Sequence, residues 1–506
     1  AENARAAGID LHGYNTIENA RDVKALRRAL GFDNWNVWGI SYGSILGQAY
    51  VKADPEGIRA VALDAIMPLD VRDSDEHWRV VNWYVRDLGK LQEICDAQPG
   101  CAGRYPDIRG RLERAVQSLA DQPMEIEVTD TEVFPSGKAR LFQDVAAFLP
   151  FMFLYEQQNY PAMPALIYAW ADALEQRDET LMQALVMSMS DGFFSSSEGM
   201  SNAIHCADGG TAGQARANLR DAAEFPVLGS VLGDEELNRR RVAMCQELGM
   251  PLRNGEQYAA VQTALPSLII EGDMDPITPP PNAKAILPGF ENGTYVEFPY
   301  AGHGPSRSVE CGGAMLNAFF DDPQADPDLS CVEEMEMPEM ITPIFRTGFL
   351  PRLLVLQGED NKKLLVPGLW LGLPLIVLLA ALFVLTFSPL LKSVDGRAAI
   401  PAGSARILAW ASSLASIISV AVIGASAGLA AKVSFGLPLF GFMPWGLFGA
   451  GAGLAAGLLG LLTLVATVRA RGLYSLPFSR MLGFFLTGAA AMALSAFLLA
   501  WDLGPF

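Results

Sequence analysis

Hydrophobic residues follow two different patterns along the chain, and the first occupies the N-terminal part. Between residues 16 and 66, a helical stretch, the apolar run "WNVWGI", a second helical stretch and the apolar run "IRAVALDAI" follow one another. Short apolar runs of this kind are typical of strands buried in a sheet. Two more runs, "PSLIIEG" and "GTYVEF", occur between residues 266 and 298. Strands that alternate with helices predict an α/β fold with a parallel sheet.

The second pattern consists of long apolar stretches in the C-terminal part. Four segments contain no Asp, Glu, Lys or Arg, namely residues 364–391, 407–431, 433–468 and 481–501. About 20 apolar residues are enough for a helix to cross a bilayer. We therefore predict an all-α bundle of four transmembrane helices in the lipid bilayer, with the third helix beginning near Phe442.

Basic residues between these segments predict their orientation. The first and third loops are rich in Lys and Arg, the middle loop has only Lys432, and the C-terminus has none. By the positive-inside rule the two rich loops are cytoplasmic, so the N-terminal part and the C-terminus lie outside. Three basic residues before the first span, Arg352, Lys362 and Lys363, favour the opposite orientation. The basic residues of the rich loops are Lys392, Arg397, Arg406, Arg469, Arg471 and Arg480.

Glycines recur at intervals of four within two of the predicted spans. One set is Gly424 with Gly428, and the other is Gly449 with Gly453 and Gly457. Small residues at this spacing let helices approach closely in a membrane. We expect both sets to pack the four helices against one another; a contact between two copies of the chain is the alternative.

Composition narrows the range of partners. Of the formal net charge of −19, residues 361–506 contribute +7 and residues 1–360 contribute −26. Such an acidic N-terminal part argues against nucleic acid as a partner. The sequence contains no cluster of metal ligands and no phosphate-binding glycine loop, so we expect no metal and no cofactor.

The stretch "GISYGS", residues 39–44, has the pattern G-x-S-x-G with Ser41 at its centre. It follows a predicted strand and precedes a predicted helix, which is the context of a nucleophile elbow. We expect Gly39 and Gly43 to be required because a side chain at either position would strike the neighbouring strand or helix. The alternative is an ordinary turn whose serine only caps the following helix.

A serine nucleophile needs a base, and the base needs an acid that orients it. Asp273 and Asp275 follow one predicted strand, and His303 follows the next. Open parallel sheets place their sites at such strand ends. We therefore predict Ser41, an aspartate and His303 as a catalytic triad, and we interpret the remaining histidines, His12, His77 and His205, as structural or surface residues.

Three separated blocks of sequence resemble the tripeptidyl aminopeptidase and proline iminopeptidase branch of the α/β-hydrolases. They are "YNTIENARDVKALRRALGFDNWNVWGISYGS", "EGDMDPITPP", and "AGHG" followed by Cys311 and Cys331. The resemblance covers about residues 5–70 and 262–332 and implies an α/β-hydrolase fold with Asp275, rather than Asp273, as the triad acid. The expected mechanism is peptide hydrolysis through an acyl-enzyme, with the backbone N–H of Tyr42 as an oxyanion donor.

The cysteines agree with a protein exposed to an oxidising compartment. All six precede the apolar stretches, and an even number suits disulfides, although spacing alone leaves 15 pairings open. The resemblance to secreted members of this branch implies three particular pairs. These are Cys95 with Cys101, Cys206 with Cys245, and Cys311 with Cys331.

The chain departs from this branch at its beginning. The first strands of the fold and the glycine-rich loop that donates part of the oxyanion hole should precede Ala1. We therefore expect that the N-terminal strands and a signal peptide are missing and are encoded upstream. The loss of one oxyanion donor costs about 100- to 1000-fold in rate, so the chain by itself is expected to be an inactive fragment.

The resemblance implies five regions. They are residues 1–70, the core with the elbow; 71–260, a helical insertion over the active site; 261–332, the rest of the core with the triad acid and base; 333–363, a linker; and 364–506, the transmembrane helices.

The predicted function is that of an outward-facing, membrane-anchored serine aminopeptidase acting on peptides with a free N-terminus. An exopeptidase must bind the substrate ammonium group, and Asp208 in the insertion is a candidate carboxylate, with support of a turn as the alternative. One triad supports several acyl transfers, so a membrane-associated esterase or lipase is the second possibility. The third is a degenerate, non-catalytic hydrolase-like module.

Overall fold

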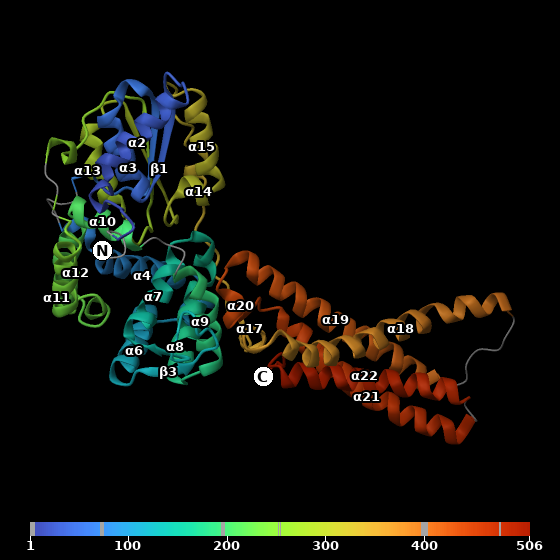
Figure 1. Ribbon diagram of the computed structural model, residues 1–506. Coiled ribbons are helices and arrows are strands. Elements are labelled where there is room, and N and C mark those ends of the chain that lie inside the picture. The colour runs from blue at the N-terminus through green and yellow to red at the C-terminus, as the bar shows by residue number, and fades with distance from the viewer. Residues whose placement is uncertain are drawn as a thin grey trace. The chain divides into compact units, whose positions relative to one another are not determined.

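A computed structural model describes residues 6–70, 75–193, 198–250, 252, 255–395, 403–474 and 477–505 (Figure 1). The chain divides into two compact units. The first comprises Ala1–Met124, Arg140–Gln176 and Gly192–Met340, and the second comprises Glu125–Ala139, Arg177–Asp191 and Ile341–Phe506.

A parallel sheet of four strands forms the centre of the first unit, in the order β1-β2-β5-β6. The predicted α/β class is confirmed, and all four expected strands are present. Their bounds are β1 Trp35–Ile40, β2 Ile58–Asp64, β5 Ser267–Gly272 and β6 Gly293–Phe298.

Helices cover both faces of the sheet. On β2, Val61 and Leu63 pack towards α2, α3 and α13, whereas Ala60 and Ala62 pack towards α15. This alternation follows from the two-residue period of a strand. Figure 1 shows α2 and α3 on one side of the strands and α15 on the other. The bounds are α2 Thr16–Ala29, α3 Tyr42–Ala53, α13 Pro280–Ile286, α14 Pro305–Ser308 and α15 Glu310–Asp321.

The run "WNVWGI" forms a strand as predicted, but the prediction that it is buried is wrong. It becomes β1, which lies at the edge of the described sheet and pairs only with β2 within the described residues. Trp38 on this strand is 49% exposed. An apolar run does not show how many strands pair with it, because pairing depends on segments distant in the sequence.

A largely helical insertion separates β2 from β5. The helices of the insertion that fall mainly in the first unit are α4 Val80–Asp96, α5 Pro99–Ala102, α6 Ile108–Asp121, α7 Gln143–Leu154, α8 Met163–Glu175, α10 Glu198–Asp208, α11 Gly210–Glu224 and α12 Glu235–Glu247. The second unit includes most of the hairpin β3 Met124–Glu127 and β4 Lys138–Leu141 and of α9 Glu179–Phe193.

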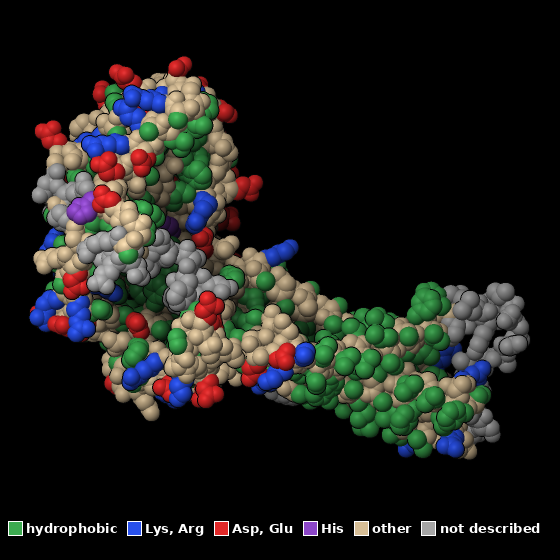
Figure 2. Space-filling view, in the orientation of Figure 1, with side chains coloured by type: hydrophobic (Ala, Val, Ile, Leu, Met, Phe, Trp, Pro, Cys, Tyr) green, Lys and Arg blue, Asp and Glu red, His purple; other side chains and the backbone are tan. Residues whose placement is uncertain are grey.

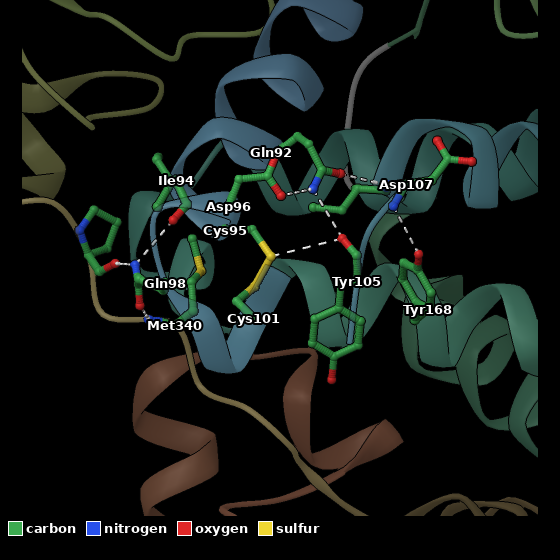
Figure 3. Close-up of a disulfide and its surroundings, with 12 residues drawn as sticks. Gln92, Ile94, Cys95, Asp96, Gln98, Cys101, Tyr105, Asp107, Tyr168 and Met340 are labelled. Carbon is green, nitrogen blue, oxygen red and sulfur yellow. Dashed lines mark hydrogen bonds between the residues drawn. A yellow bond between two sulfur atoms is a disulfide. The ribbon is translucent and has the colours of Figure 1, made fainter. Parts of the chain in front are cut away.

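All six cysteines form the three disulfides that the family resemblance implied. The pairs are Cys95–Cys101, Cys206–Cys245 and Cys311–Cys331. Beside the first of them, Gln98 donates to Ile94 O and Pro338 O and accepts from Met340 N (Figure 3). The end of the first unit is thereby fastened to the loop between α4 and α5.

The second unit contains four helices that are long and apolar enough to cross a membrane, as predicted. The apolar stretches fall in α18 Leu365–Asp395, α19 Gly403–Val433, α21 Gly446–Tyr474 and α22 Phe478–Ala500. The third helix begins at Gly446 rather than near Phe442, because Gly441–Phe442 forms β8 and pairs with β7, Phe345–Arg346. Short helices α17 Phe349–Glu359 and α20 Leu437–Phe440 complete this unit, and Arg397 falls outside the described residues.

Hydrophobic side chains cover much of the face of these four helices that Figure 2 shows. Leu365, Ile376 and Phe448 are each more than 60% exposed. In water, such a surface would be costly because each of these side chains would gain about 1.5–3 kcal/mol from burial. An apolar surrounding such as a bilayer removes that cost.

Glycines let α21 approach its neighbours, which confirms one of the two predicted sets. A Cβ on Gly449 would lie 3.0 Å from Ser419 O, and one on Gly453 would lie 2.3 Å from Leu498 Cδ1. A Cβ on Gly457 would lie 2.6 Å from Ser495 Oγ. The prediction is wrong for Gly424 and Gly428, whose added Cβ atoms would meet no described atom within 4 Å.

Gly460 of α21 and Gly488 of α22 face each other, backbone against backbone. A Cβ on either residue would lie 2.7 Å from the carbonyl oxygen of the other. We predict that Gly460→Val destabilises the protein by about 1–3 kcal/mol, because overpacking against backbone cannot be relieved by a side-chain rotation. The measurement is thermal unfolding of the purified protein in detergent.

Gly451→Val is the matched control on the same helix, because an added Cβ there meets nothing within 4 Å. Its unfolding midpoint is expected to equal that of the unmodified protein. An equal decrease of the unfolding midpoint in Gly460→Val and Gly451→Val would contradict the packing assigned to Gly460.

Candidate active site

Ser41 lies at a sharp turn between β1 and α3. Its backbone angles are φ 60° and ψ −122°, a conformation that non-glycine residues rarely adopt and that costs about 1–3 kcal/mol. The Ser41 N–H donates to Asp64 O at 3.0 Å, and Ser44 N donates to Ser41 O at 2.8 Å. The turn is therefore held by the neighbouring strand on one side and by the helix on the other.

The two glycines of the motif have different roles. A Cβ on Gly39 would lie 2.1 Å from Gly43 O, so the close approach of strand and helix requires glycine at position 39. A Cβ on Gly43 would meet no described atom within 4 Å. The expectation that a side chain at either position would collide is therefore confirmed for Gly39 and wrong for Gly43, which supplies its carbonyl to the contact.

Asp275 and His303 are in direct contact at the ends of neighbouring strands. His303 Nδ1 lies 2.8 Å from Asp275 Oδ2, and both side chains are buried. Asp275 Oδ1 also accepts from the backbone N–H groups of Ile277 and Thr278 at 2.9 Å each. Asp273 instead forms an ion pair with Lys90 at 3.0 Å, so Asp275 is the aspartate that the structure brings to the histidine.

Each member of this pair favours the charged form of the other. Burial alone raises the pKa of Asp275, but the charge and hydrogen bond of His303, together with the backbone hydrogen bonds from Thr278 and Ile277, outweigh it and lower that pKa below its usual value. Burial alone lowers the pKa of His303, but the charge and hydrogen bond of Asp275, with the charge of Asp64, raise it above its usual value. The neutral form of His303, which can accept a proton, is therefore reached only at a higher pH than for an ordinary histidine.

Thr278 is a site residue that the sequence reasoning did not single out. Its Oγ1 donates to Asp275 Oδ2 at 2.7 Å and lies 3.1 Å from His303 Nδ1. It stands three residues after the aspartate in "DPITPP", and this proximity is the signal that could have identified it. Thr278 fixes the carboxylate oxygen that contacts the imidazole.

The insertion also holds the loops of the acid and the base. Tyr155 O accepts from His303 N at 2.8 Å, and the two rings lie 5.0 Å apart. Tyr160 OH donates to Met274 O at 3.0 Å, and Arg86 Nη2 donates to Asp275 O at 3.1 Å. The backbone of both loops is thus fixed from outside the sheet.

The hydroxyl of Ser41 is placed by the elbow, but no hydrogen bond between it and His303 occurs among the described residues. In hydrolases without substrate, this contact is often long and shortens only when substrate binds. The next residue, Tyr42, is the first of α3, and its hydroxyl contacts Thr16 Oγ1 at 2.9 Å and Asn19 Nδ2 at 3.1 Å.

Asp208 lies near Tyr42 but is engaged at the start of α2. Its Oδ2 accepts from Thr16 Oγ1 at 2.6 Å and from Thr16 N at 3.3 Å. Together with Tyr42, Trp78 and His205 it lines a small apolar cavity. No group of three or more His, Cys, Asp or Glu residues suited to a metal ion occurs in the described part of the chain.

The contrast between the two elbow glycines gives a direct test of the turn. We expect Gly39→Ala to destabilise the protein by at least about 1–3 kcal/mol, because the new methyl group would overlap a backbone carbonyl. Gly43→Ala is the control with the same change in size, and it should leave the unfolding midpoint almost unchanged. Both variants are measured by thermal unfolding; equal destabilisation would refute the assigned contact.

Two segments of the chain match known protein families. Residues 3–88, which contain Ser41, match the family described as alpha/beta hydrolase fold. Residues 231–331, which contain Asp275 and His303, match the family described as TAP-like protein.

Curated relatives are similar over part of their length. Serine protease Hip1 of Mycobacterium tuberculosis (strain ATCC 25618 / H37Rv) is 23% identical over 290 residues, which cover 54% of this chain and 54% of that protein. The chain thus spans about half the length of this relative. A probable proline iminopeptidase of Streptomyces coelicolor is 33% identical over 63 residues, which cover 12% of this chain and 20% of that protein.

Among solved structures, the α/β-hydrolase MGS-M2 from a Medee basin deep-sea metagenome library is 15% identical, with a TM-score of 0.27. The match covers 63% of this chain and 75% of that one. A TM-score this low adds nothing to the assignment, which rests on the family matches and on the sheet itself. The chain has an α/β-hydrolase fold, in which residues 231–331 match a TAP-like family, and its described C-terminal part is a helical region with four candidate membrane spans.

Proposed function

We propose that this chain belongs to a serine hydrolase that removes residues from the N-terminus of peptides. The observation that carries the proposal is the buried contact of 2.8 Å between His303 Nδ1 and Asp275 Oδ2, at the same edge of the sheet as the Ser41 elbow. The similarity to a serine protease and to a probable proline iminopeptidase supports this class of substrate.

In the proposed mechanism, Ser41 Oγ attacks the carbonyl carbon of the scissile bond while His303 Nε2 accepts the hydroxyl proton. The negative charge that develops on the carbonyl oxygen is stabilised by the backbone N–H of Tyr42, at the positive end of α3. His303 then donates its proton to the leaving amine, which departs and leaves an acyl-enzyme. Water hydrolyses this ester by the same proton transfers in reverse order.

Asp275 orients the imidazole in this mechanism. Its carboxylate accepts a hydrogen bond from the Nδ1–H of His303, so that Nε2 is the nitrogen available to the serine. Three further hydrogen bonds, two from backbone N–H groups and one from Thr278 Oγ1, keep the carboxylate in place. The acid therefore need not reorganise as the imidazole becomes charged.

In this proposal, a residue of the insertion binds the amine at the N-terminus of the substrate. A carboxylate there would pair with the ammonium group and fix the distance from the N-terminus to Ser41. Asp208 is disfavoured for this role because Thr16 already provides two hydrogen-bond donors to it.

We further propose that the four apolar helices anchor the enzyme in a membrane, with the hydrolase unit outside the cytoplasm. The support comes from the length and apolar character of the helices, from the three disulfides and from the basic loops.

The substrate class is tested with paired peptides that differ only in a free or an acetylated N-terminus, alongside a short-chain ester. We expect the full-length protein to cleave the free peptide and to lose at least about tenfold in kcat/KM on the acetylated one, because the ammonium contact is lost. Ser41→Ala serves as the blank and should abolish cleavage. Equal rates on both peptides would end the aminopeptidase proposal, and turnover of the ester alone would favour an esterase.

Topology is tested by reporter fusions. Fusions after Cys331 and at the C-terminus are expected to be extracytoplasmic, whereas fusions near Arg397 and Arg471 are expected to be cytoplasmic. The physical reason is that basic loops are retained on the cytoplasmic side. A cytoplasmic reading after Cys331 would contradict the orientation and the oxidising environment of the cysteines.

A further inference from the structure

Asp64, the last residue of β2, touches the nucleophile turn through its backbone. Its carbonyl oxygen accepts the N–H of Ser41 at 3.0 Å, and its Cα is in register with Ile40, the residue before the nucleophile. The side chain of Asp64 is fully buried. Burial of a carboxylate costs free energy unless hydrogen-bond or charge partners compensate for it. The contacts of the Asp64 side chain therefore indicate its role.

The carboxylate of Asp64 holds the loop of the catalytic base. Asp64 Oδ2 accepts from Ser306 N at 2.8 Å and also from Ser306 Oγ. Ser306 lies three residues after His303, and between them Gly304 turns the chain with φ +76°. Trp38 of β1 donates from Nε1 to the same Ser306 Oγ at 3.0 Å. One carboxylate and one serine thus join β1, β2 and the His303 loop.

Both hydrogen bonds of the carboxylate reach the same oxygen. Within the described part of the chain, Asp64 Oδ1 has no hydrogen-bond partner and is not accessible to solvent. Burial raises the pKa of Asp64 to about 7, against the opposing effects of Ser306 and of the charge of His303. The other acidic groups that interact with it are Asp275, after β5, and Glu271, within β5.

Asp64 and His303 are therefore coupled in two ways. The mechanical coupling runs through Ser306, which ties the histidine loop to the strand next to the nucleophile. The electrostatic coupling acts because an ionised Asp64 favours the imidazolium form of His303, and the reverse also holds. The imidazolium is the form that the base takes during acyl transfer.

We propose that Asp64 is a second positioning acid of this site, which holds the His303 loop against the Ser41 strand through Ser306 and stabilises the imidazolium together with Asp275. The proposal rests on the proposed function for its kinetic consequence. Its structural and electrostatic content concerns His303 alone and can be measured without turnover.

The first experiment measures the pKa of His303 by NMR on histidine-labelled full-length protein in detergent, in the Ser41→Ala background. The chain has four histidines, and the signal of His303 is assigned by its loss in His303→Gln. In Asp64→Asn the amide oxygen can still accept from Ser306 while the negative charge is gone. We expect the pKa of His303 to fall, because an anion that favours the imidazolium has been removed.

Asp54→Asn is the matched control. Asp54 is also a buried aspartate with hydrogen bonds, to Arg27 and Tyr50, but it lies at the end of α3, remote from the base. It should leave the pKa of His303 unchanged. An unchanged value in Asp64→Asn, or an equal fall in both variants, would overturn the electrostatic part of the proposal whether or not the protein is an aminopeptidase.

The second experiment measures the pH profile of kcat/KM on the best substrate. In Asp64→Asn the acid limb should move to lower pH, because a less stabilised imidazolium loses its proton earlier as pH rises. In Asp64→Ala, which also removes the acceptor, kcat should fall by roughly 10- to 100-fold with KM almost unchanged. If kcat falls in Asp64→Ala but the acid limb of the pH profile does not shift in Asp64→Asn, the electrostatic role is refuted and Asp64 has a structural role only. Cleavage that survives Ser41→Ala would instead refute the proposed function.

Discussion

The parallel register of four strands is the constraint on which the site depends. Ile40 pairs with Asp64, Asp64 pairs with Ile270, and Gly272 pairs with Phe298. Because parallel strands run in the same direction, their carboxyl ends meet at one edge of the sheet. A slip of one residue in any pair would turn a side chain to the opposite face and separate these groups.

Polar contacts from the insertion hold the loops that follow β5 and β6. Loops beyond strand ends have few backbone partners of their own, and a buried backbone group without a partner is costly. Tyr155, Tyr160 and Arg86 meet this need for the loops of Asp275 and His303. The insertion is therefore part of the site. The loops of Asp275 and His303 depend on its folding for these hydrogen bonds.

The helical region is governed by a different balance. Its outer surface is hydrophobic, so association of the helices depends on close packing and not on removal of apolar surface from water. Glycine at positions 453, 457 and 460 of α21 allows that packing because each faces a neighbouring helix at a distance where a side chain would not fit. Other glycines of these helices, such as Gly424, Gly428 and Gly451, meet no described neighbour and have no such role.

Several features followed from the sequence by itself, because they depend on local rules. Short apolar runs predicted the strands β1, β2, β5 and β6. The length and lack of charge of four C-terminal segments predicted the four long helices. The elbow around Ser41 follows from a local pattern, and the disulfide pairing followed from a family resemblance. The roles of Ser41, Asp275 and His303 remain predictions, since chemistry at a site is not a local property of the chain.

Only the tertiary structure decided which segments meet. It showed that β1 lies at the edge of the described sheet, that Gly39 but not Gly43 faces a collision, and that Thr278 reaches the Asp275–His303 pair. It also brought Ser306 to Asp64, 242 residues earlier in the chain. Contacts across such separations depend on the summed packing of every element between them, and no periodicity or short motif encodes that sum.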